Sequence, residues 1–462
     1  MSAFDLSRLA ERRVGVFGAG AEGRSAWEAL ARRGAAPAVV LADREPPAGT
    51  VPEGLRVLSG DRMEEALGAL DVLVRSPGVR LDHPLLAAAA RRGVAVTTTT
   101  NVFFAEVKAK AGLPVIGITG SKGKSTTATL AWRVLREAGL PAVLAGNIGR
   151  PPLYALDEVL ASRAVSVLEL SSYQCADLAL GPTVAVLLSL FPEHMDWHGG
   201  AEAYFAAKLR LAETQEPGDL TLYNAADPRL VARLPLGPAR HQPFQDEGTL
   251  HFAGGWFRDG GERLFDDSAV RLRGRHNRIN AVAALAAARP FGAAPGDLER
   301  ILTTFEGLPH RLEPLGLHAG IRWVNDSIST APEAAAAALE AFPGEVDTLI
   351  AGGADRGYDF DVLARALAAS AVRQVITLPP GGDAIARALR AARPPGHPSE
   401  RLAGRPEIHA APDLAAAVAH AAAVTAPGRI CLLSPGSPSY GVFRDFEDRG
   451  RQFRELVEGL GE

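Results

Sequence analysis

Short apolar runs alternate with alanine- and leucine-rich helical stretches through the first hundred residues. An apolar run of four to eight residues between turn residues is typical of a buried strand, and a glycine often ends a helix. On this basis "GRSAWEALARRG" predicts a helix at residues 23–34, and strands are predicted at "RVGVFGAG" (13–20), "PAVVLAD" (37–43), "DVLVRSPGV" (71–79) and "VAVTT" (94–98). This rhythm favours a parallel sheet with helices on its faces.

The pattern pauses twice, near "KAKAGLP" and near "GLPHRLE", and these pauses divide the chain into three segments. In the second segment, strands are predicted at 114–120, 164–170 and 182–190, and helices at 125–139 and 276–292. In the third segment, strands are predicted at 322–327, 346–353, 373–379 and 428–436. Each segment is therefore an α/β unit, and we predict domains at 1–110, 111–310 and 311–462.

Composition adds limits to this picture. The chain has 462 residues, which exceeds one comfortable core, and its formal net charge of −4 gives no reason to expect a nucleic acid partner. Two distant cysteines form no disulfide or metal framework, and neither a signal peptide nor a membrane span is recognisable, so we expect a cytoplasmic protein without a membrane partner. Oligomeric state cannot be derived from the sequence.

Lysine usage is unusual. Only five of the 49 basic residues are lysines, at positions 108, 110, 122, 124 and 208. Arginine cannot replace lysine where a compact amine that loses its proton is needed. The lysines outside the first pause, which contains Lys108 and Lys110, are therefore candidates for chemistry.

A glycine-rich turn, "TGSKGKST" at 119–126, follows a predicted strand and precedes a predicted helix. Backbone N–H groups and the positive end of a helix bind phosphate oxygens in such a turn. Gly120 and Gly123 permit the tight backbone, Lys124 can reach the outer phosphates, and Ser125 or Thr126 can hold Mg²⁺. The common nucleotide loop has a further glycine at the position of Ile118, so the match is incomplete.

Acidic and imidazole side chains follow the neighbouring predicted strands. Glu169 ends the strand of "VSVLELSSYQ", where a buried carboxylate without a partner would be costly and a metal is the simpler explanation. The segment "FPEHMDWHGG" supplies Glu193, His194, Asp196 and His198, of which His194 is a plausible second metal ligand.

A second glycine motif, "GAGAEG" at 18–23, is followed by Asp43 at the end of a predicted strand. This spacing fits the dinucleotide fingerprint and, alone, would indicate a nicotinamide-dependent oxidoreductase. The fingerprint physically specifies only a pyrophosphate at a helix N-terminus, and UDP also contains a pyrophosphate and a ribose. Both interpretations therefore stay open.

Several motifs occur in one order along the chain: "GITGSKGKSTT", "AGNIG", "LELSSYQ", "EHMDWH", "AAKLR", "GRHNRINAVAALA", "GLPHRLE", "NDSISTAPEAAAAAL" and "LLSPGSPSYGVFRDFEDRGRQF". Together they resemble the Mur ligase family, ATP-dependent amide-forming enzymes of peptidoglycan synthesis. The family loop reads T-G-[ST]-x-G-K-[ST], which accounts for Ile118. The resemblance implies a Rossmann-like N-terminal domain for a UDP-sugar, a central P-loop ATPase-type α/β domain and a Rossmann-like C-terminal α/β domain.

The resemblance also implies roles for individual residues. Lys124, Glu169, His194 and Lys208 form the implied catalytic set, and Lys208 matches the lysine that carries a CO₂-derived carbamate. Ser125, Glu169, His194 and the modified Lys208 are the implied ligands of two Mg²⁺ ions. The implied ATP contacts are Gly120, Ser121, Lys122, Gly123, Lys124, Ser125, Thr126, Asn277, Arg311 and Asp326. The implied UDP-substrate contacts are Gly20, Ala21, Glu22, Asp43, Arg44, Ser76, Pro77, Gly78, Asn147 and His194.

The implied reaction joins D-glutamate to UDP-N-acetylmuramoyl-L-alanine through an acyl phosphate. Closure of the third domain would bring Arg311 and Asp326 onto the nucleotide. The matching glutamate residues are Thr330, Arg356, Ser439 and Phe446. Ile328 in "NDSIST" stands where the family often has lysine, which leaves L-glutamate as an alternative. A noncatalytic ATP-binding scaffold and a folate-type polyglutamate ligase are further alternatives; the N-terminal UDP-type motif argues against the latter.

Overall fold

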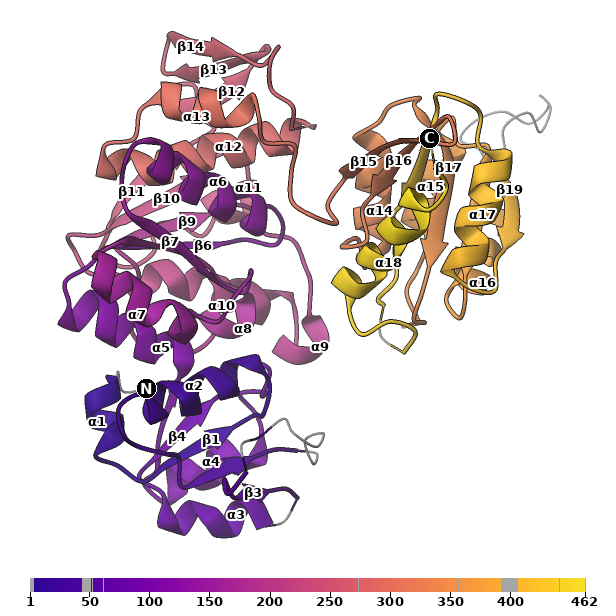
Figure 1. The fold of residues 1–462 in the computed structure, drawn as a ribbon. Coiled ribbons are helices and arrows are strands. Elements are labelled where there is room, and N and C mark those ends of the chain that lie inside the picture. The colour runs from indigo at the N-terminus through magenta and orange to yellow at the C-terminus, as the bar shows by residue number, and fades with distance from the viewer. Residues whose placement is uncertain are drawn as a thin grey trace. The chain divides into compact units, whose positions relative to one another are not determined.

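The computed structural model describes residues 4–43, 51, 53–60, 62–272, 274–355, 357–391, 406–439 and 441–461. The chain forms two compact units (Figure 1). The first unit contains residues up to 270 together with 275–304, and the second contains 271–274 and the residues from 305 onward. Within the described residues, no helix has the length and apolar composition that crossing a bilayer requires.

The first sheet of unit 1 is fully parallel, with the strand order β3-β2-β1-β4-β5. The order reverses between β1 and β4, and ligands of such sheets usually bind beyond the carboxyl ends of the strands at such a switch point. The strands are β1 (Val14–Phe17), β2 (Val39–Leu41), β3 (Val57–Leu58), β4 (Val72–Arg75) and β5 (Ala95–Thr98). The helices are α1 (Leu6–Ala10), α2 (Ala21–Ala31), α3 (Arg62–Ala66), η1 (Leu67–Ala69) and α4 (Pro84–Arg91).

The first predicted pause in the pattern is helical. Helix α5 (Thr99–Phe104) continues into a π-helical turn, η2 (Ala105–Lys110), and leads directly to the second sheet. Lys108 in this turn is mostly buried, and its Nζ lies 2.6 Å from Asp219 Oδ2. The lysine therefore anchors this helical connection to the second sheet.

The second sheet is also parallel, with the order β11-β10-β9-β6-β8-β7. Its central strands are continuous apolar runs because helices cover both faces. The strands are β6 (Val115–Thr119), β7 (Ala142–Gly146), β8 (Val165–Glu169), β9 (Val184–Leu187), β10 (Leu220–Asn224) and β11 (Arg240–Phe244). The helices are α6 (Lys124–Glu137), α7 (Pro152–Ser162), α8 (Ser172–Cys175), α9 (Met195–His198), α10 (Ala201–Glu213), α11 (Pro228–Val231), α12 (Arg275–Ala288), η3 (Arg289–Phe291) and α13 (Pro295–Leu302).

An antiparallel three-stranded sheet, which the sequence analysis did not predict, precedes α12 in the chain (Figure 1). It consists of β12 (Leu250–Ala253), β13 (Trp256–Asp259) and β14 (Glu262–Asp266).

Unit 2 contains a six-stranded sheet of order β15-β16-β20-β17-β18-β19, parallel except for the antiparallel edge strand β15. The strands are β15 (Glu313–His318), β16 (Ile321–Asn325), β17 (Val346–Gly352), β18 (Gln374–Leu378), β19 (Glu407–Ala410) and β20 (Ile430–Leu433). The helices are α14 (Pro332–Glu340), α15 (Asp361–Ala368), α16 (Gly382–Ala391), α17 (Leu414–Val424) and α18 (Phe446–Glu458). The predicted α/β class is confirmed; the exact three-domain division stays a prediction.

Candidate active site

The phosphate loop connects β6 to the N-terminus of α6, as the sequence predicts. Gly120 and Gly123 have φ angles of 157° and 87°, the second in the left-handed region. A Cβ on Gly123 would lie 2.3 Å from Asn280 Oδ1, and one on Gly120 would lie 2.8 Å from Leu188 Cβ. Both positions therefore require glycine because neighbouring groups occupy the space of a side chain.

The side chains of the loop are anchored within unit 1. Lys124 Nζ donates to the carbonyl oxygens of Gly120 and Ser121, each at 3.0 Å. Ser121 is buried, and its hydroxyl donates to Phe191 O at 2.8 Å while accepting from Phe191 N at 2.9 Å. Lys122 Nζ lies 2.6 Å from Glu193 Oε1. The loop is thus attached to the segment that follows β9.

Glu169 ends β8, the strand beside β6, so its carboxylate lies next to the start of the phosphate loop. The residue is only 2% exposed; its Oε1 accepts from Asn147 Nδ2 at 3.0 Å, whereas its Oε2 has no hydrogen-bond partner among the residues that the structure describes. A buried carboxylate oxygen without a partner is costly, and a cation would satisfy it. The site therefore fits Mg²⁺, although Asn147, a predicted substrate contact, bonds to the carboxylate.

Lys208 projects from α10 and is 1% exposed. Its Nζ donates to Gly120 O at 2.8 Å, which places the amine at the phosphate loop. Burial, and secondly the charge of Lys124, lower the pKa of Lys208 to about 7. An amine reacts with CO₂ only when it is neutral, so this environment suits the carbamate that the resemblance implies.

His194 lies at the N-cap of α9 with a left-handed backbone (φ 51°). Burial lowers the pKa of His194, which favours the neutral imidazole that ligates metals. Its ring lies 6.2 Å from the ring of Tyr204, whose hydroxyl donates to Ser121 Oγ at 3.2 Å. Within the described residues, no three His, Cys, Asp or Glu side chains form a group that could hold a metal ion.

Asn277 lies on α12, and its Oδ1 accepts from Asn280 Nδ2 at 3.1 Å. Asn280 also packs against Gly123 of the phosphate loop. Sequence reasoning missed Asn280 and Tyr204. The three-residue spacing of Asn277 and Asn280 on one helix face was the available signal for the first.

The second glycine motif lies at the switch point between β1 and β4. Gly20 is the N-cap of α2, and a Cβ on Gly23 would lie 1.8 Å from Gly18 O, so helix and turn are in close contact. Ser76 N donates to Phe17 O at 2.8 Å, which joins the loop of Ser76, Pro77 and Gly78 to this motif. The two predicted parts of the UDP site thus lie together at the carboxyl ends of β1 and β4.

Two further predicted UDP contacts have partners inside the protein. Both oxygens of Glu22 are bound, one by Thr99 Oγ at 2.5 Å and the other by Gln174 Nε2 at 2.9 Å. Asp43 is exposed, with His83 Nε2 3.1 Å from its carboxylate. Arg44 lies outside the described residues.

In unit 2, Asp326 follows β16 and is buried. Its carboxylate accepts from Ser329 Oγ, Ser434 Oγ and Leu312 N, at 2.5, 2.8 and 3.1 Å. Burial raises the pKa of Asp326 to about 6 despite these bonds. Arg311, the other implied nucleotide contact of unit 2, immediately precedes Leu312 in the chain.

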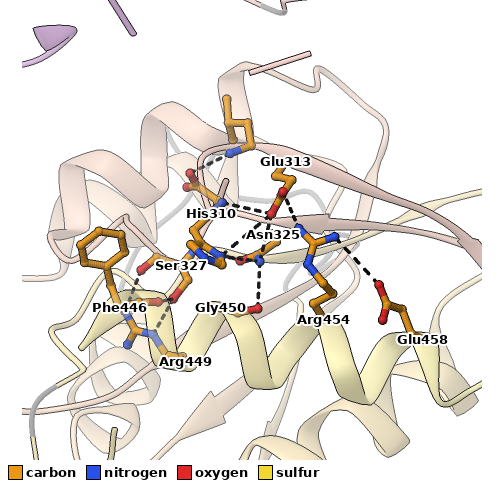
Figure 2. A network of polar contacts seen from close by, with 11 residues as sticks. His310, Glu313, Asn325, Ser327, Phe446, Arg449, Gly450, Arg454 and Glu458 are labelled. Carbon is orange, nitrogen blue, oxygen red and sulfur yellow. Dashed lines mark hydrogen bonds and ion pairs between the residues drawn. The ribbon is translucent and has the colours of Figure 1, made fainter. Parts of the chain in front are cut away.

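The residues of unit 2 that are predicted to bind the substrate glutamate lie on segments that the buried Arg449 connects. Arg449 of α18 donates to Ser327 Oγ and Ser327 O at 3.0 and 2.8 Å, and Ser327 Oγ donates to Phe446 O at 2.7 Å (Figure 2). Arg449 also donates to Ser437 O at 3.1 Å. Thr330 lies just before α14, Ser439 is buried, and Phe446 begins α18. Arg356 lies outside the described residues.

The same network holds the start of unit 2. Asn325 Nδ2 lies 3.0 Å from both His310 Nδ1 and Gly450 O, and Glu313 accepts from His310 N at 3.0 Å (Figure 2). A Cβ on Gly450 would lie 2.2 Å from His310 Nδ1, so the helix must carry glycine where the ring packs. The segment around Arg311 is therefore fixed to α18.

Fold and site define an α/β enzyme with a phosphate loop, and comparison with known proteins identifies its family. The Mur ligase middle domain matches residues 118–288, the MurD-like N-terminal domain of Mur ligases matches 12–98, and the glutamate ligase domain of Mur ligases matches 310–436. The chain belongs to the Mur ligase family and is an ATP-dependent ligase. These matches do not support the oxidoreductase alternative.

Full-length relatives have specific names. The chain is 40% identical to a UDP-N-acetylmuramoyl-L-alanine–L-glutamate ligase of Salinispora tropica, over 98% of both chains. It is 38% identical to a ligase of the same name from Xanthomonas axonopodis pv. citri, over 99% of both. It is 37% identical to a UDP-N-acetylmuramoylalanine–D-glutamate ligase of Symbiobacterium thermophilum, over 88% of both. A solved MurF ligase of Thermotoga maritima in complex with ADP has the same fold, with a TM-score of 0.60, 18% identity, and 96% of this chain and 94% of that chain covered.

Proposed function

We propose that this ligase joins glutamate to UDP-N-acetylmuramoyl-L-alanine at the expense of ATP. The observation that carries the proposal is the meeting of three features at the carboxyl ends of β6 and β8. These are a phosphate loop, a buried carboxylate with an unpartnered oxygen, and the buried Lys208 amine at 2.8 Å from Gly120 O. The substrates follow from the names of the full-length relatives.

In the proposed reaction, the γ-phosphoryl group of ATP passes to an oxygen of the L-alanyl carboxylate, and ADP leaves. The amine of glutamate then attacks the acyl carbon, and the resulting tetrahedral intermediate expels phosphate and releases a proton. The protein contributes mainly by positioning the reactants and balancing charge. Lys124 and the N-terminus of α6 stabilise the negative phosphate oxygens, and the sheet ends hold the loop in place.

Ser125, Glu169, His194 and a carbamylated Lys208 are the proposed ligands of two Mg²⁺ ions. Bound Mg²⁺ would supply positive charge to the phosphate oxygens. The unpartnered Glu169 oxygen and the lowered pKa of Lys208 support this assignment. Asn277, Arg311 and Asp326 remain proposed nucleotide contacts, and the loops at the carboxyl ends of β1 and β4 remain the proposed UDP site.

Two observations favour L-glutamate as the second substrate over the D-glutamate that the motifs first indicate. Ile328 replaces the lysine that D-glutamate ligases often carry, and the relatives at 38–40% identity are named for L-glutamate. The 37% identical relative from Symbiobacterium is named for the D enantiomer. We therefore propose L-glutamate.

The test is phosphate release with ATP, Mg²⁺ and UDP-N-acetylmuramoyl-L-alanine, with each enantiomer in turn. We expect kcat/KM for L-glutamate to exceed that for D-glutamate by at least about tenfold, or about 1.4 kcal/mol. A clear preference for D-glutamate would reverse the stereochemical proposal and leave the reaction type standing. No release with either enantiomer would refute the proposed substrates.

A further inference from the structure

A fully buried arginine lies at the carboxyl end of β4, directly before the Ser76–Pro77–Gly78 loop. The Arg75 side chain has no solvent exposure. Its Nη1 donates to the carbonyl oxygens of Ser76 and Pro77, each at 3.2 Å, and to that of Val79. One guanidinium nitrogen thus contacts three carbonyl oxygens in and beside the loop, which fixes the path of the loop.

The other edge of the guanidinium binds a carboxylate from the second sheet. Arg75 Nε and Nη2 lie 2.9 and 2.7 Å from Asp177 Oδ2. Asp177 is 2% exposed at its side chain and follows α8, the short helix that starts three residues after Glu169. The pair therefore links the loop of the first sheet to the strand end that carries Glu169.

Further buried polar contacts cross between the two sheets beside this pair. Asn101 Nδ2 donates to Asp177 O at 2.9 Å, and Asn101 Oδ1 accepts from Ala179 N at 2.8 Å. Glu22, in the first turn of α2, binds Gln174 of α8. Both loops of the proposed UDP site are thus attached to α8 or to Asp177, which follows it.

A buried ion pair is weak evidence for stability, because well-packed apolar residues often serve as well. Arginine offers more than a charge here, since its planar fork binds a carboxylate and several carbonyls at once. Lysine could pair with Asp177 but could not reproduce that arrangement. The contacts of Arg75 are therefore better explained by a role in placing the Ser76–Pro77–Gly78 loop than by a contribution to folding stability alone.

We propose that Arg75, held by Asp177, is a positioning residue that sets the Ser76–Pro77–Gly78 loop for binding of the UDP-linked substrate. This inference rests on the proposed function. It gives the buried pair a role in affinity for a nucleoside diphosphate sugar, while the ATP site on α6 is left unchanged.

The test measures calorimetric affinity for UDP-N-acetylmuramoyl-L-alanine and for a non-hydrolysable ATP analogue, with steady-state KM values for both. The variants are Arg75→Met, Arg75→Lys and Asp177→Asn, each checked for a cooperative melting transition. The matched control is Arg13→Met. Arg13 precedes β1 and pairs with Asp71 through Nη2 at 2.7 Å and Nε at 3.2 Å, but this pair is exposed and lies at the opposite strand ends.

We expect Arg75→Met to raise the Kd and KM for the UDP-substrate by at least about tenfold, with ATP-analogue affinity within about threefold of wild type. Arg75→Lys should bind the UDP-substrate more tightly than Arg75→Met but less tightly than wild type, and Asp177→Asn should also lose affinity for it. Arg13→Met should keep wild-type affinity for both ligands. A folded Arg75→Met or Arg75→Lys variant with wild-type UDP-substrate affinity would overturn the inference. Equal losses for both ligands would also overturn it, as evidence of a general structural role. Wild-type protein without affinity for the UDP-substrate would instead refute the proposed function.

Discussion

The Lys208 amine combines burial, a lowered pKa and contact with the phosphate loop. Arg at this position could not become neutral and could not form a carbamate. In a chain with only five lysines, the proposed carbamate would explain why a lysine stands here. At position 124, a lysine is explained instead by the phosphate oxygens that its amine would bind.

At the residue scale, we predict a carbamate on Lys208 that ¹³C NMR detects after equilibration with ¹³C-bicarbonate. The folded-state pKa of about 7 lies below the ordinary lysine value, so the amine is neutral above pH about 7 and protonated below it. The carbamate signal should therefore grow as the pH rises from about 6 to about 8. Lys208→Ala should lack the signal, whereas Lys108→Ala should keep it. A signal unchanged in Lys208→Ala would contradict the assignment.

The same residue gives a kinetic prediction. Lys208→Ala should lose at least about 99% of kcat, because a carboxylate-like ligand is missing, and acetate should restore part of the activity. Steady-state phosphate release measures both. A fully active Lys208→Arg variant would exclude the carbamate, since guanidinium cannot form it.

At the scale of elements, most strands are predictable because continuous apolar runs identify buried parallel strands. The β12–β14 sheet escaped prediction because its sequence, with "RDGGERLFDD" at 258–267, is largely polar. The phosphate loop, Glu169 and Lys208 follow from motifs. Arg75 and Asp177 could not be paired from the sequence, since 102 residues separate them and only the packing of two sheets brings them together.

The β6–α6 turn provides a test of the element itself. Gly123→Ala places a Cβ against Asn280 Oδ1 in a left-handed backbone, so we expect ATP-analogue affinity to fall at least about tenfold. The control Gly139→Ala lies beyond the other end of α6; its backbone has φ 77°, but among the described residues no heavy atom other than those of its chain neighbours lies within 4 Å of the added Cβ. It should lower stability by about 1 kcal/mol and leave nucleotide affinity unchanged. Equal nucleotide affinity in both variants would show that Gly123 is not needed for the phosphate loop to bind ATP.

Helix α18 provides the corresponding test in unit 2. Arg449→Met removes the side chain that joins the segments of Ser327 and Ser437, so we expect the KM for glutamate to rise at least about tenfold. The KM for ATP should change much less. The control is Arg451→Met, since Arg451 lies on the same helix and its side chain is half exposed. Its KM for glutamate should be close to the wild-type value. If the KM for ATP rose and the KM for glutamate did not, Arg449 would not belong to the glutamate site.

At the scale of the molecule, the phosphate loop and the second glycine motif belong to different sheets of unit 1, and the proposed glutamate residues belong to unit 2. Lys124→Ala should therefore lower kcat by at least about a thousandfold, while the Kd for the UDP-substrate stays within about threefold. Calorimetry and phosphate release measure the two quantities. Parallel loss of both would contradict this division of roles.

In the proposed reaction, ATP drives amide formation through an acyl phosphate on the UDP-linked substrate. The most direct test uses UDP-N-acetylmuramoyl-L-alanine with ¹⁸O in the alanyl carboxylate, together with ATP, Mg²⁺ and L-glutamate. Mass spectrometry of the released phosphate should show one ¹⁸O atom transferred for each amide bond formed. Amide product accompanied by unlabelled phosphate, or phosphate release without amide product, would refute the proposed acyl-phosphate route.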